Sequence, residues 1–386
     1  MYNFNYYVPT RIYFGKGQIS HLAELKDYGS RVLLCYGGGS IRRNGIYDKA
    51  VSIMKEAGLT IDELPGVEPN PKIETVRKGA ELCKQNGIDM VLAIGGGSTI
   101  DCAKMVAAAA KYDGDAWDLV RHGKRIQAAL PIFSVLTLAA TGSEMDEFSV
   151  ISDMSKNEKW GTASDFFFPT MSVLDPTYTF TVSKKQTAAG TADMMSHTFE
   201  NYFNFTEGAD VQARFAEGLL RTMIKYGPIA LAEPDNYDAR ANLMWAGSNA
   251  INGIIADGAQ PNWCVHPMEH ELSAFYDITH GQGLAILTPV WMEYVLSEKT
   301  APKFAEYGRN VWDIREGSDM DIAKKAIGCT RTFLFDTMEL PSTLREVGIT
   351  EKTHFAVMAE KAAKGCVGCF VPLSAEDIQA IFDRAF

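Results

Sequence analysis

The chain has 386 residues, with 37 lysines and arginines against 48 aspartates and glutamates, so its formal net charge is −11. An acidic surface repels phosphate backbones and anionic lipids, which argues against nucleic acid or a membrane as the partner. Hydrophobic residues form 46% of the chain and charged residues 22%, as is typical of a globular protein. The seven cysteines are odd in number and scattered, and no leader or membrane segment is evident, so we expect a cytoplasmic protein without a disulfide framework.

The first half of the chain alternates short apolar runs with glycine turns and helical patterns. The apolar runs at residues 31–36, 90–94 and 131–136 predict buried strands. The first strand ends in the Gly-Gly-Gly-Ser turn at 37–40, and the second ends in the same four residues at 95–98. Repeated units of strand, turn and helix predict right-handed crossovers and a parallel sheet that helices cover on both faces.

Strand signals nearly disappear after about Ser183. Amphipathic segments rich in Ala, Leu and Met continue from there to the end of the chain. We therefore expect an α/β Rossmann-like domain over residues 1–180, followed by an all-α domain over residues 181–386.

The glycine turns are candidate phosphate sites. A strand that runs through Gly-Gly-Gly-Ser at 95–98 into a helix leaves backbone N–H groups and the positive helix end open to a phosphate. Thr137 and Ser143 follow the third strand at the same sheet edge, so a dinucleotide is long enough to reach all three strand ends. The turn has neither GxGxxG spacing nor a P-loop lysine, and the alternative is that such turns are only tight connections.

The turn at Gly38, Gly39 and Ser40 bears on the choice of nucleotide. An acidic residue there would bind a ribose 2′-hydroxyl and repel a 2′-phosphate, and none is present. Arg42 and Arg43 follow directly, which favours NADP(H) over NAD(H). The alternative is that these two arginines are a solvated helix face.

The second half contains a cluster of candidate metal ligands. Asp193 and His197 are four residues apart in a helical segment, so both side chains can reach one ion. His266, His270 and His280 follow within the same half. Imidazoles with one carboxylate suit Fe(II) or Zn(II), although linear spacing does not decide which histidines bind.

With these motifs the chain resembles the iron-containing (group III) alcohol dehydrogenase family, and within it the NADPH-dependent butanol dehydrogenases and broad-range aldehyde reductases. The resemblance rests on Asp-x3-His and His-x3-His-x9-His-Gly-x-Gly in the second half. It runs nearly end to end, from Phe-Gly-Lys-Gly at 14–17 through the turn at 95–98 and Ala-Thr-Gly-Ser-Glu at 140–144 to Pro-Leu-Ser at 372–374. The family's NAD-preferring members carry an acidic residue near the position of Gly39, which agrees with the argument for NADP(H).

The resemblance implies roles for individual residues. Its metal ligands correspond to Asp193, His197, His266 and His280, and His270 corresponds to a catalytic histidine that moves protons. Asp101 could orient the phosphate-binding helix or reach the cofactor. The cofactor-binding positions implied by the glycine turns and the resemblance together are Gly38, Gly39, Ser40, Asn70, Gly95, Gly96, Gly97, Ser98, Asp101, Thr137, Thr141, Ser143 and Lys159.

The implied activity is hydride transfer between NADP(H) and a small to medium primary alcohol or aldehyde such as butanol or butanal. Alternatives are an enzyme of the dehydroquinate-synthase or glycerol-dehydrogenase type on the same fold, or a metallohydrolase that uses no dinucleotide. A synthase of that type needs clustered Lys and Arg for a phosphorylated substrate, whereas we expect aromatic neighbours near the metal: Phe148, Trp263, Phe275 and Tyr276. The family also predicts a homodimer.

Tyr2, Phe4, Tyr6 and Tyr7 lie close to the start of the chain. We expect this aromatic segment to pair as an edge strand with a second copy of the chain.

Overall fold

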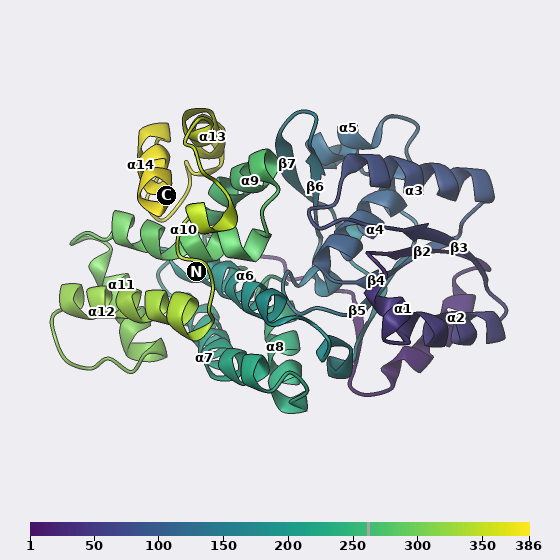
Figure 1. Cartoon of the computed structure of the whole chain (residues 1–386), viewed down its shortest axis with the longest axis horizontal. Coiled ribbons are helices and arrows are strands. Elements are labelled where there is room, and N and C mark those ends of the chain that lie inside the picture. Colours follow the sequence, from purple (N-terminus) through teal and green to yellow (C-terminus); the bar gives the residue numbers. More distant parts are fainter. Residues whose placement is uncertain (261–262) are drawn as a thin grey trace. The chain divides into compact units, whose positions relative to one another are not determined.

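The computed structural model describes residues 1–260 and 263–386 (Figure 1). They form two compact units. The α/β unit consists of Tyr7–Val182 with Asp235–Met244, and the helical unit consists of Met1–Tyr6, Ser183–Pro234 and Trp245–Phe386. Residues 235–244 belong to the first unit although they lie within the helical half of the sequence.

A six-stranded parallel sheet forms the centre of the α/β unit. Its strand order is β1-β8-β5-β4-β2-β3, and every neighbouring pair is parallel. The register pairs Tyr36 with Ile94 and Gly95 with Leu136, so the carboxyl ends of β2, β4 and β5 lie next to one another. The strands are β1 (Arg11–Phe14), β2 (Arg31–Tyr36), β3 (Thr60–Pro65), β4 (Met90–Gly95), β5 (Ile132–Leu136) and β8 (Met171–Leu174).

Helices cover both faces of this sheet, which confirms the predicted architecture (Figure 1). On one face lie η1 (Gln18–Asp27), α1 (Ser40–Arg43) and α2 (Ile46–Glu56), and on the other lie α3 (Ile73–Asn86), α4 (Gly97–Ala109) and α5 (Ala116–Arg121).

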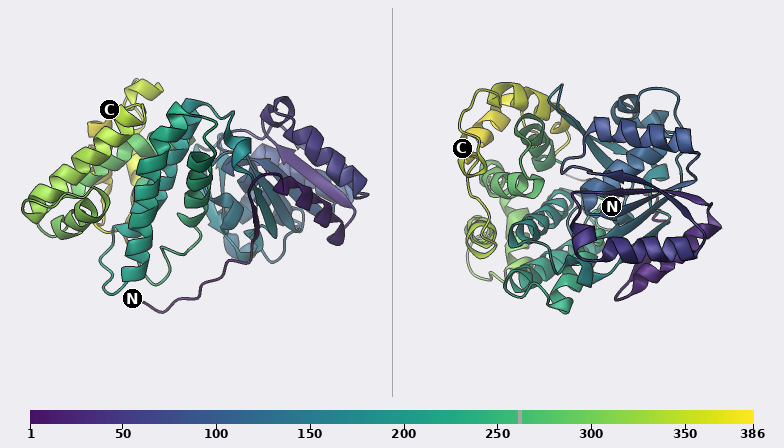
Figure 2. Two further views of the ribbon diagram at one scale, coloured as in Figure 1. Left: turned by 90° about the horizontal axis from the view of Figure 1, so that it is seen from below. Right: turned by 45° about the vertical axis from the view of Figure 1, so that its right-hand side comes forward.

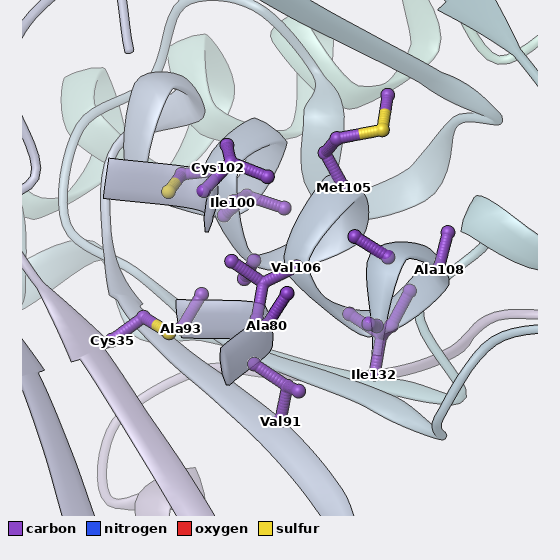
Figure 3. Close-up of a cluster of buried hydrophobic side chains, with 14 of the residues drawn as sticks. Cys35, Ala80, Val91, Ala93, Ile100, Cys102, Met105, Val106, Ala108 and Ile132 are labelled. Atoms are coloured by element: carbon purple, nitrogen blue, oxygen red, sulfur yellow. The ribbon is translucent and has the colours of Figure 1, made fainter. Parts of the chain in front are cut away.

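Side chains of successive strand residues alternate between the two cores. Leu34 packs in the core between the sheet and the helices η1, α1 and α2. Cys35, Val91 and Ala93 pack in the core on the opposite face, which also contains Val106 of α4 (Figure 3). Because both faces are buried, the central strands are continuous apolar runs.

The unit also contains elements that the sequence patterns did not predict. Strands β1, β3 and β8 extend the sheet on both sides of the predicted strands. An antiparallel hairpin pairs β6 (Phe148–Asp153) with β7 (Glu158–Ala163). Single-turn 3-10 helices complete the unit: η2 (Gly123–Arg125), η3 (Ser143–Met145), η4 (Asp165–Phe167) and η5 (Pro176–Thr179).

The second unit contains helices and, among the residues described, no strand. Helix α8 begins in the α/β unit and ends in this one. The helices are α6 (Lys184–Tyr202), α7 (Asp210–Ala232), α8 (Tyr237–Asn249), α9 (Val265–Tyr276), α10 (His280–Val295), α11 (Ala301–Val311), α12 (Asp319–Thr332), the π-helical η6 (Phe333–Thr337), η7 (Arg345–Val347), α13 (Phe355–Ala362), η8 (Ala363–Gly365) and α14 (Ala375–Ala385).

Helix α6 is the central element of the helical unit. Ser183 caps its start by accepting a hydrogen bond from the backbone N–H of Gln186, and every residue from Thr187 to Tyr202 is buried. It packs against α7 and α10, and Figure 2 shows the long teal helices α6 and α7 side by side. A helix buried on all sides carries its polar side chains into the interior, where each needs a partner.

The aromatic residues at the start of the chain form no edge strand. The structure assigns no strand to residues 1–10, and the backbone N–H of Tyr2 donates to the carbonyl of Gly258. Tyr2 and Phe4 remain exposed, and pairing with a second copy of the chain stays a prediction.

The cysteines depart from expectation in one place, because Cys264 and Cys369 form a disulfide. The other five are free thiols. No helix in the described part of the chain combines the length and apolarity needed to cross a membrane.

Candidate metal and nucleotide sites

Helix α6 places Asp193 and His197 on one face, as the four-residue spacing predicts. Asp193 Oδ1 lies 3.7 Å from His197 Nε2, and both side chains are about 5% exposed or less. Their burial follows from the position of α6 at the centre of the unit. A carboxylate and an imidazole therefore lie together in the interior, almost inaccessible to solvent.

Helices α9 and α10 bring two more imidazoles to the same oxygen. Asp193 Oδ1 lies 3.8 Å from His266 Nε2 and 3.6 Å from His280 Nε2. Two ligands about 2.1 Å from a tetrahedral ion lie roughly 3.4 Å apart, so these separations suit shared coordination better than direct hydrogen bonding. Within the described residues, Asp193 Oδ1 and His266 Nε2 are buried without a hydrogen-bond partner. Orphaned polar atoms that converge in this way fit a metal ion.

The charges of the buried carboxylates in the cluster favour a cation. Burial lowers the pKa of His197 to about 3, which keeps its imidazole neutral, as a metal ligand must be. Burial opposes ionisation of Asp193, but the three imidazoles hold the pKa of its carboxyl well below the usual value. Burial also disfavours the charged form of His266, but Glu200 and Asp193 outweigh it and raise its pKa to about 9. The carboxylates therefore attract positive charge to this point.

Two further carboxylates, which the sequence analysis missed, orient the histidines. Glu200 Oε1 accepts a hydrogen bond of 2.8 Å from the backbone N–H of His266 and lies 3.1 Å from its Nδ1. Glu269 Oε2 contacts Nδ1 of the His280 ring directly. A histidine ligand commonly donates its second ring nitrogen to a carboxylate, which fixes the ring and its tautomer. Glu200 lies seven residues after Asp193 on one helix face, a spacing that could have revealed it.

His270 belongs to the same cluster but occupies its edge. It is half-buried, and its ring centroid lies 5.7 Å from that of His280 and 6.1 Å from that of His266. Ligand atoms of Glu269, His270 and His280 all lie within 4.8 Å of one another, as do those of Asp193, His266 and His280. The structure thus brings together all four histidines that the sequence analysis selected.

The glycines of the His-Gly-Gln-Gly motif allow close helix packing. A Cβ at Gly281 would collide with the backbone carbonyl of Ala189 in α6, and one at Gly283 would lie 2.8 Å from Glu269 Cγ. The motif therefore lets the start of α10 approach α6 and α9, which places His280 beside Asp193.

The expected aromatic surroundings are found only in part. The ring of Trp263 lies 5.1 Å from that of His266 and 6.0 Å from that of His197. Phe275 and Tyr276 instead pack near His354. Phe148 belongs to β6 in the other unit.

In the α/β unit, the three strand ends with candidate nucleotide residues are neighbours. The backbone N–H of Thr137 donates to the carbonyl of Gly95 at 2.9 Å. A Cβ at Gly95 would lie 2.6 Å from Thr99 Cβ, and one at Gly97 would lie 2.8 Å from Thr141 Cβ. The turn therefore requires glycine at both positions.

Helix α4 begins within this turn, at Gly97. Gly96 is its N-cap and offers no side-chain cap. Ser98 follows within the first turn of the helix, which leaves N–H groups suited to a phosphate.

Several other nucleotide candidates are linked to one another within this unit. Lys159 Nζ donates to Asn70 Oδ1 at 3.1 Å, and both side chains are buried. Ser143 Oγ donates to Asp101 Oδ1 at 2.6 Å, while the backbone N–H of Val150 donates to Asp101 Oδ2 at 2.9 Å. Both carboxylate oxygens of Asp101 are thus engaged by protein groups, which favours the alternative that this residue orients α4 and its surroundings.

Next to the turn after β2 lies an acidic residue of β3, Glu63, which the sequence analysis missed. A Cβ at Gly38 or Gly39 would meet open space, and Ser40 begins α1. Arg42 donates to Glu63 Oε2 at 2.8 Å and lies over the Tyr47 ring, 3.7 Å from its centroid. Glu63, at the exposed edge strand β3, thereby offsets part of the positive charge expected here.

Comparison with known proteins agrees with this architecture. Residues 9–176 match the iron-containing alcohol dehydrogenase family, and residues 187–386 match the C-terminal domain of the Fe-containing alcohol dehydrogenase family. The chain is 57% identical over 391 residues to NADH-dependent butanol dehydrogenase A of Clostridium acetobutylicum, covering 100% of both chains. It is 42% identical over 352 residues to the NADPH-dependent aldehyde reductase of Escherichia coli, covering 90% of each.

A solved structure extends the match to three dimensions. The crystal structure of NADH-dependent butanol dehydrogenase A from Thermotoga maritima superposes with a TM-score of 0.95 at 37% identity, covering 100% of this chain and 99% of that one. The chain therefore belongs to the iron-containing alcohol dehydrogenase family.

Proposed function

We propose that this protein is a metal-dependent alcohol dehydrogenase and aldehyde reductase. It would transfer hydride between NADP(H) and a small to medium primary alcohol or aldehyde such as butanol or butanal. The observation that carries the proposal is the convergence of three imidazole Nε2 atoms within 3.8 Å of one buried, unpartnered oxygen of Asp193. Family membership and the names of the relatives, which are butanol dehydrogenases and an aldehyde reductase, support the same activity.

Asp193, His197, His266 and His280 are the residues that would hold the metal. One carboxylate with three imidazoles suits Fe(II) or Zn(II), and four protein ligands leave space for a substrate oxygen in an expanded coordination shell. When bound, the cation supplies Lewis-acid activation of the substrate oxygen and the nicotinamide ring supplies or accepts the hydride. Glu200 and Glu269 hold two of the imidazoles in the orientation that this requires.

His270 would carry the proton that accompanies hydride transfer. It is half-buried beside His280 and His266, so one of its ring nitrogens can exchange a proton with water while the cluster stays buried. Exchanging His270 for Ala should lower kcat and change its pH profile without lowering the bound-metal content. Unchanged turnover across the pH range would remove His270 from the mechanism.

The nucleotide would bind at the carboxyl ends of β2, β4 and β5. Backbone N–H groups at the start of α4 would receive its phosphates, with Thr137, Thr141, Asn70 and Lys159 beside them. A preference for NADP(H) is supported by the absence of acidic side chains at residues 37–40 and by the exposed Arg43. The relatives at 57% and 42% identity are named as NADH-dependent and NADPH-dependent respectively. The test below therefore measures kcat/KM with both nucleotides.

The decisive experiment uses chelator-stripped protein reconstituted separately with Fe(II) or Zn(II). Initial rates with butanal and propanal would be measured with NADPH and with NADH, and those with glycerol would be measured with NADP⁺ and with NAD⁺. We expect metal-dependent NADPH consumption with the aldehydes, a higher kcat/KM for NADPH than for NADH, and little reaction with glycerol and NADP⁺.

Two variants serve as a matched pair in the same assay. Asp193→Ala should lose metal and turnover while retaining NADPH binding, whereas His354→Ala removes an exposed histidine of the same unit that lies outside the cluster and should behave as wild type. Absence of any change in nicotinamide absorbance with every aldehyde would refute the proposed function and favour a hydrolase or lyase.

A further inference from the structure

Three cysteines that the proposed function does not use gather at the start of α9. Cys264 directly precedes α9, and Cys366 and Cys369 lie in the segment that follows η8. Their sulfur atoms lie within 4.8 Å of one another. The structure joins Cys264 to Cys369, whose Cα atoms are 6.2 Å apart and whose positions differ by 105 residues. That Cα separation suits a disulfide without movement of the backbone.

Cys369 is the least buried of these three cysteines. Cys264 and Cys366 are fully buried, whereas Cys369 is half-buried and follows the exposed residues Val367 and Gly368. Cys369 Sγ lies 3.4 Å from the carbonyl oxygen of Trp263, so its segment rests against the start of α9. A dissolved oxidant can therefore reach Cys369 before it reaches Cys264, which is the buried partner.

We propose that Cys264 and Cys369 are a reversible redox pair whose disulfide fastens the start of α9, and with it His266, to the segment at 366–369. The oxidant is hydrogen peroxide. The Cys369 thiolate attacks one peroxide oxygen, which breaks the O–O bond, yields a sulfenic acid and releases hydroxide. Cys264 then attacks that sulfur, so the S–S bond forms as the S–O bond breaks, and the oxygen leaves as water. The net change converts two thiols and one peroxide into one disulfide and two waters, and a dithiol reductant reverses it by exchange.

The pair has a direct route to the metal cluster. Cys264 lies two residues before His266, whose Nε2 faces Asp193 and whose backbone N–H is held by Glu200. A covalent link at Cys264 restricts the first turn of α9, so the oxidised protein should retain its metal longer than the reduced protein. This consequence rests on the proposed function, whereas the disulfide itself does not.

The first test maps the linkage in the intact protein. After treatment with hydrogen peroxide and denaturation, the number of titratable thiols should fall from seven to five, because two are consumed. Trypsin places Cys264 in residues 241–299 and both Cys366 and Cys369 in residues 365–384, so the expected product joins these two peptides. A bond within the peptide 365–384 would overturn the proposal.

Variants decide which sulfur is used. Cys369→Ser lies on the exposed segment and should abolish the link, while Cys366→Ser should keep it. Cys329→Ser is the matched control, because Cys329 is a free thiol on α12 outside the group. A link between the two peptides that persists in Cys369→Ser, or peroxide treatment that oxidises Cys369 without joining the peptides, would contradict the assignment. So would zinc bound by the reduced thiols and lost in Cys369→Ser, which would identify a thiolate metal site instead.

The second test measures the effect on the cluster. Protein loaded with redox-inert zinc is mixed with a chromogenic chelator before and after peroxide treatment. We expect several-fold slower release after oxidation in the wild type and in Cys329→Ser, and no change in Cys369→Ser. Equal release rates despite a confirmed link would overturn the tethering, whereas protein that binds no zinc at all would count against the proposed function and leave the linkage result standing.

Discussion

Replacing Glu200 by Gln tests whether the buried carboxylates tune the metal site. Glu200 Oε1 accepts a hydrogen bond of 2.8 Å from the backbone N–H of His266 and lies 3.1 Å from Nδ1 of the same residue. The amide keeps the shape and an acceptor oxygen but removes the negative charge. A hydrogen bond to a charged group contributes about 1 kcal/mol more than one between neutral groups, so weakening the one from the His266 backbone lowers metal affinity roughly fivefold. Mutations of such outer partners typically cost 10–100-fold.

The assay is a competition of apo-protein and a chelator of known affinity for Zn(II), read by absorbance, for wild type and Glu200→Gln. Glu217→Gln is the matched control, because Glu217 is also buried in the same unit but bonds Tyr202 rather than a histidine. The control should lower thermal stability and leave metal affinity unchanged. A Glu200→Gln protein that folds normally and binds zinc within threefold of wild type would refute the reasoning about the outer carboxylate.

Four further substitutions follow from local geometry. Gly97→Val adds a side chain at a position where even a Cβ would collide with Thr141. NADPH binding, measured by fluorescence, should therefore be lost while the metal content stays unchanged. Glu63→Gln releases Arg42 from its ion pair, so the ratio of kcat/KM for NADPH over NADH should rise several-fold, and an unchanged ratio would separate Arg42 from nucleotide choice. Gly281→Ala should weaken zinc binding in chelator competition, whereas Gly218→Ala, in a helix with open space around it, should raise stability by up to about 1 kcal/mol in urea unfolding.

The sequence predicted the fold where burial leaves a simple pattern. The strands at 31–36, 90–94 and 131–136 occupy the middle of the sheet, and their apolar runs agree with β2, β4 and β5 to within one residue. The missed strand β3 lies at the edge and is exposed or half-buried except at Leu64, while β8 has only four residues. Strands of this kind are specified by the neighbours they pair with, which a single sequence does not reveal.

In the candidate metal site, too, some residues could be found from the sequence pattern and others could not. Helical spacing was sufficient for Asp193 and His197, because both lie on one helix. Glu269 reaches His280 only through the packing of α9 against α10, and no regular spacing encodes that contact. The pairing of Cys264 with Cys369 spans 105 residues, so no local spacing predicts it. Helical spacing predicted contacts within an element, whereas contacts between distant elements followed from the family resemblance or were missed.

The glycines next to the metal cluster show why a motif can be read for the wrong reason. His-Gly-Gln-Gly resembles a flexible binding loop, yet Gly281 lies in α10, and the atom that forbids a side chain there is a backbone carbonyl of α6. A backbone atom cannot rotate away, so any Cβ at 281 must displace one of the two helices. His280 is the adjacent residue, and Asp193 lies one turn beyond Ala189 on α6, so that displacement separates two candidate ligands directly. The motif therefore acts on the metal through packing, and the glycine is required by the distance between two helices rather than by contact with a ligand.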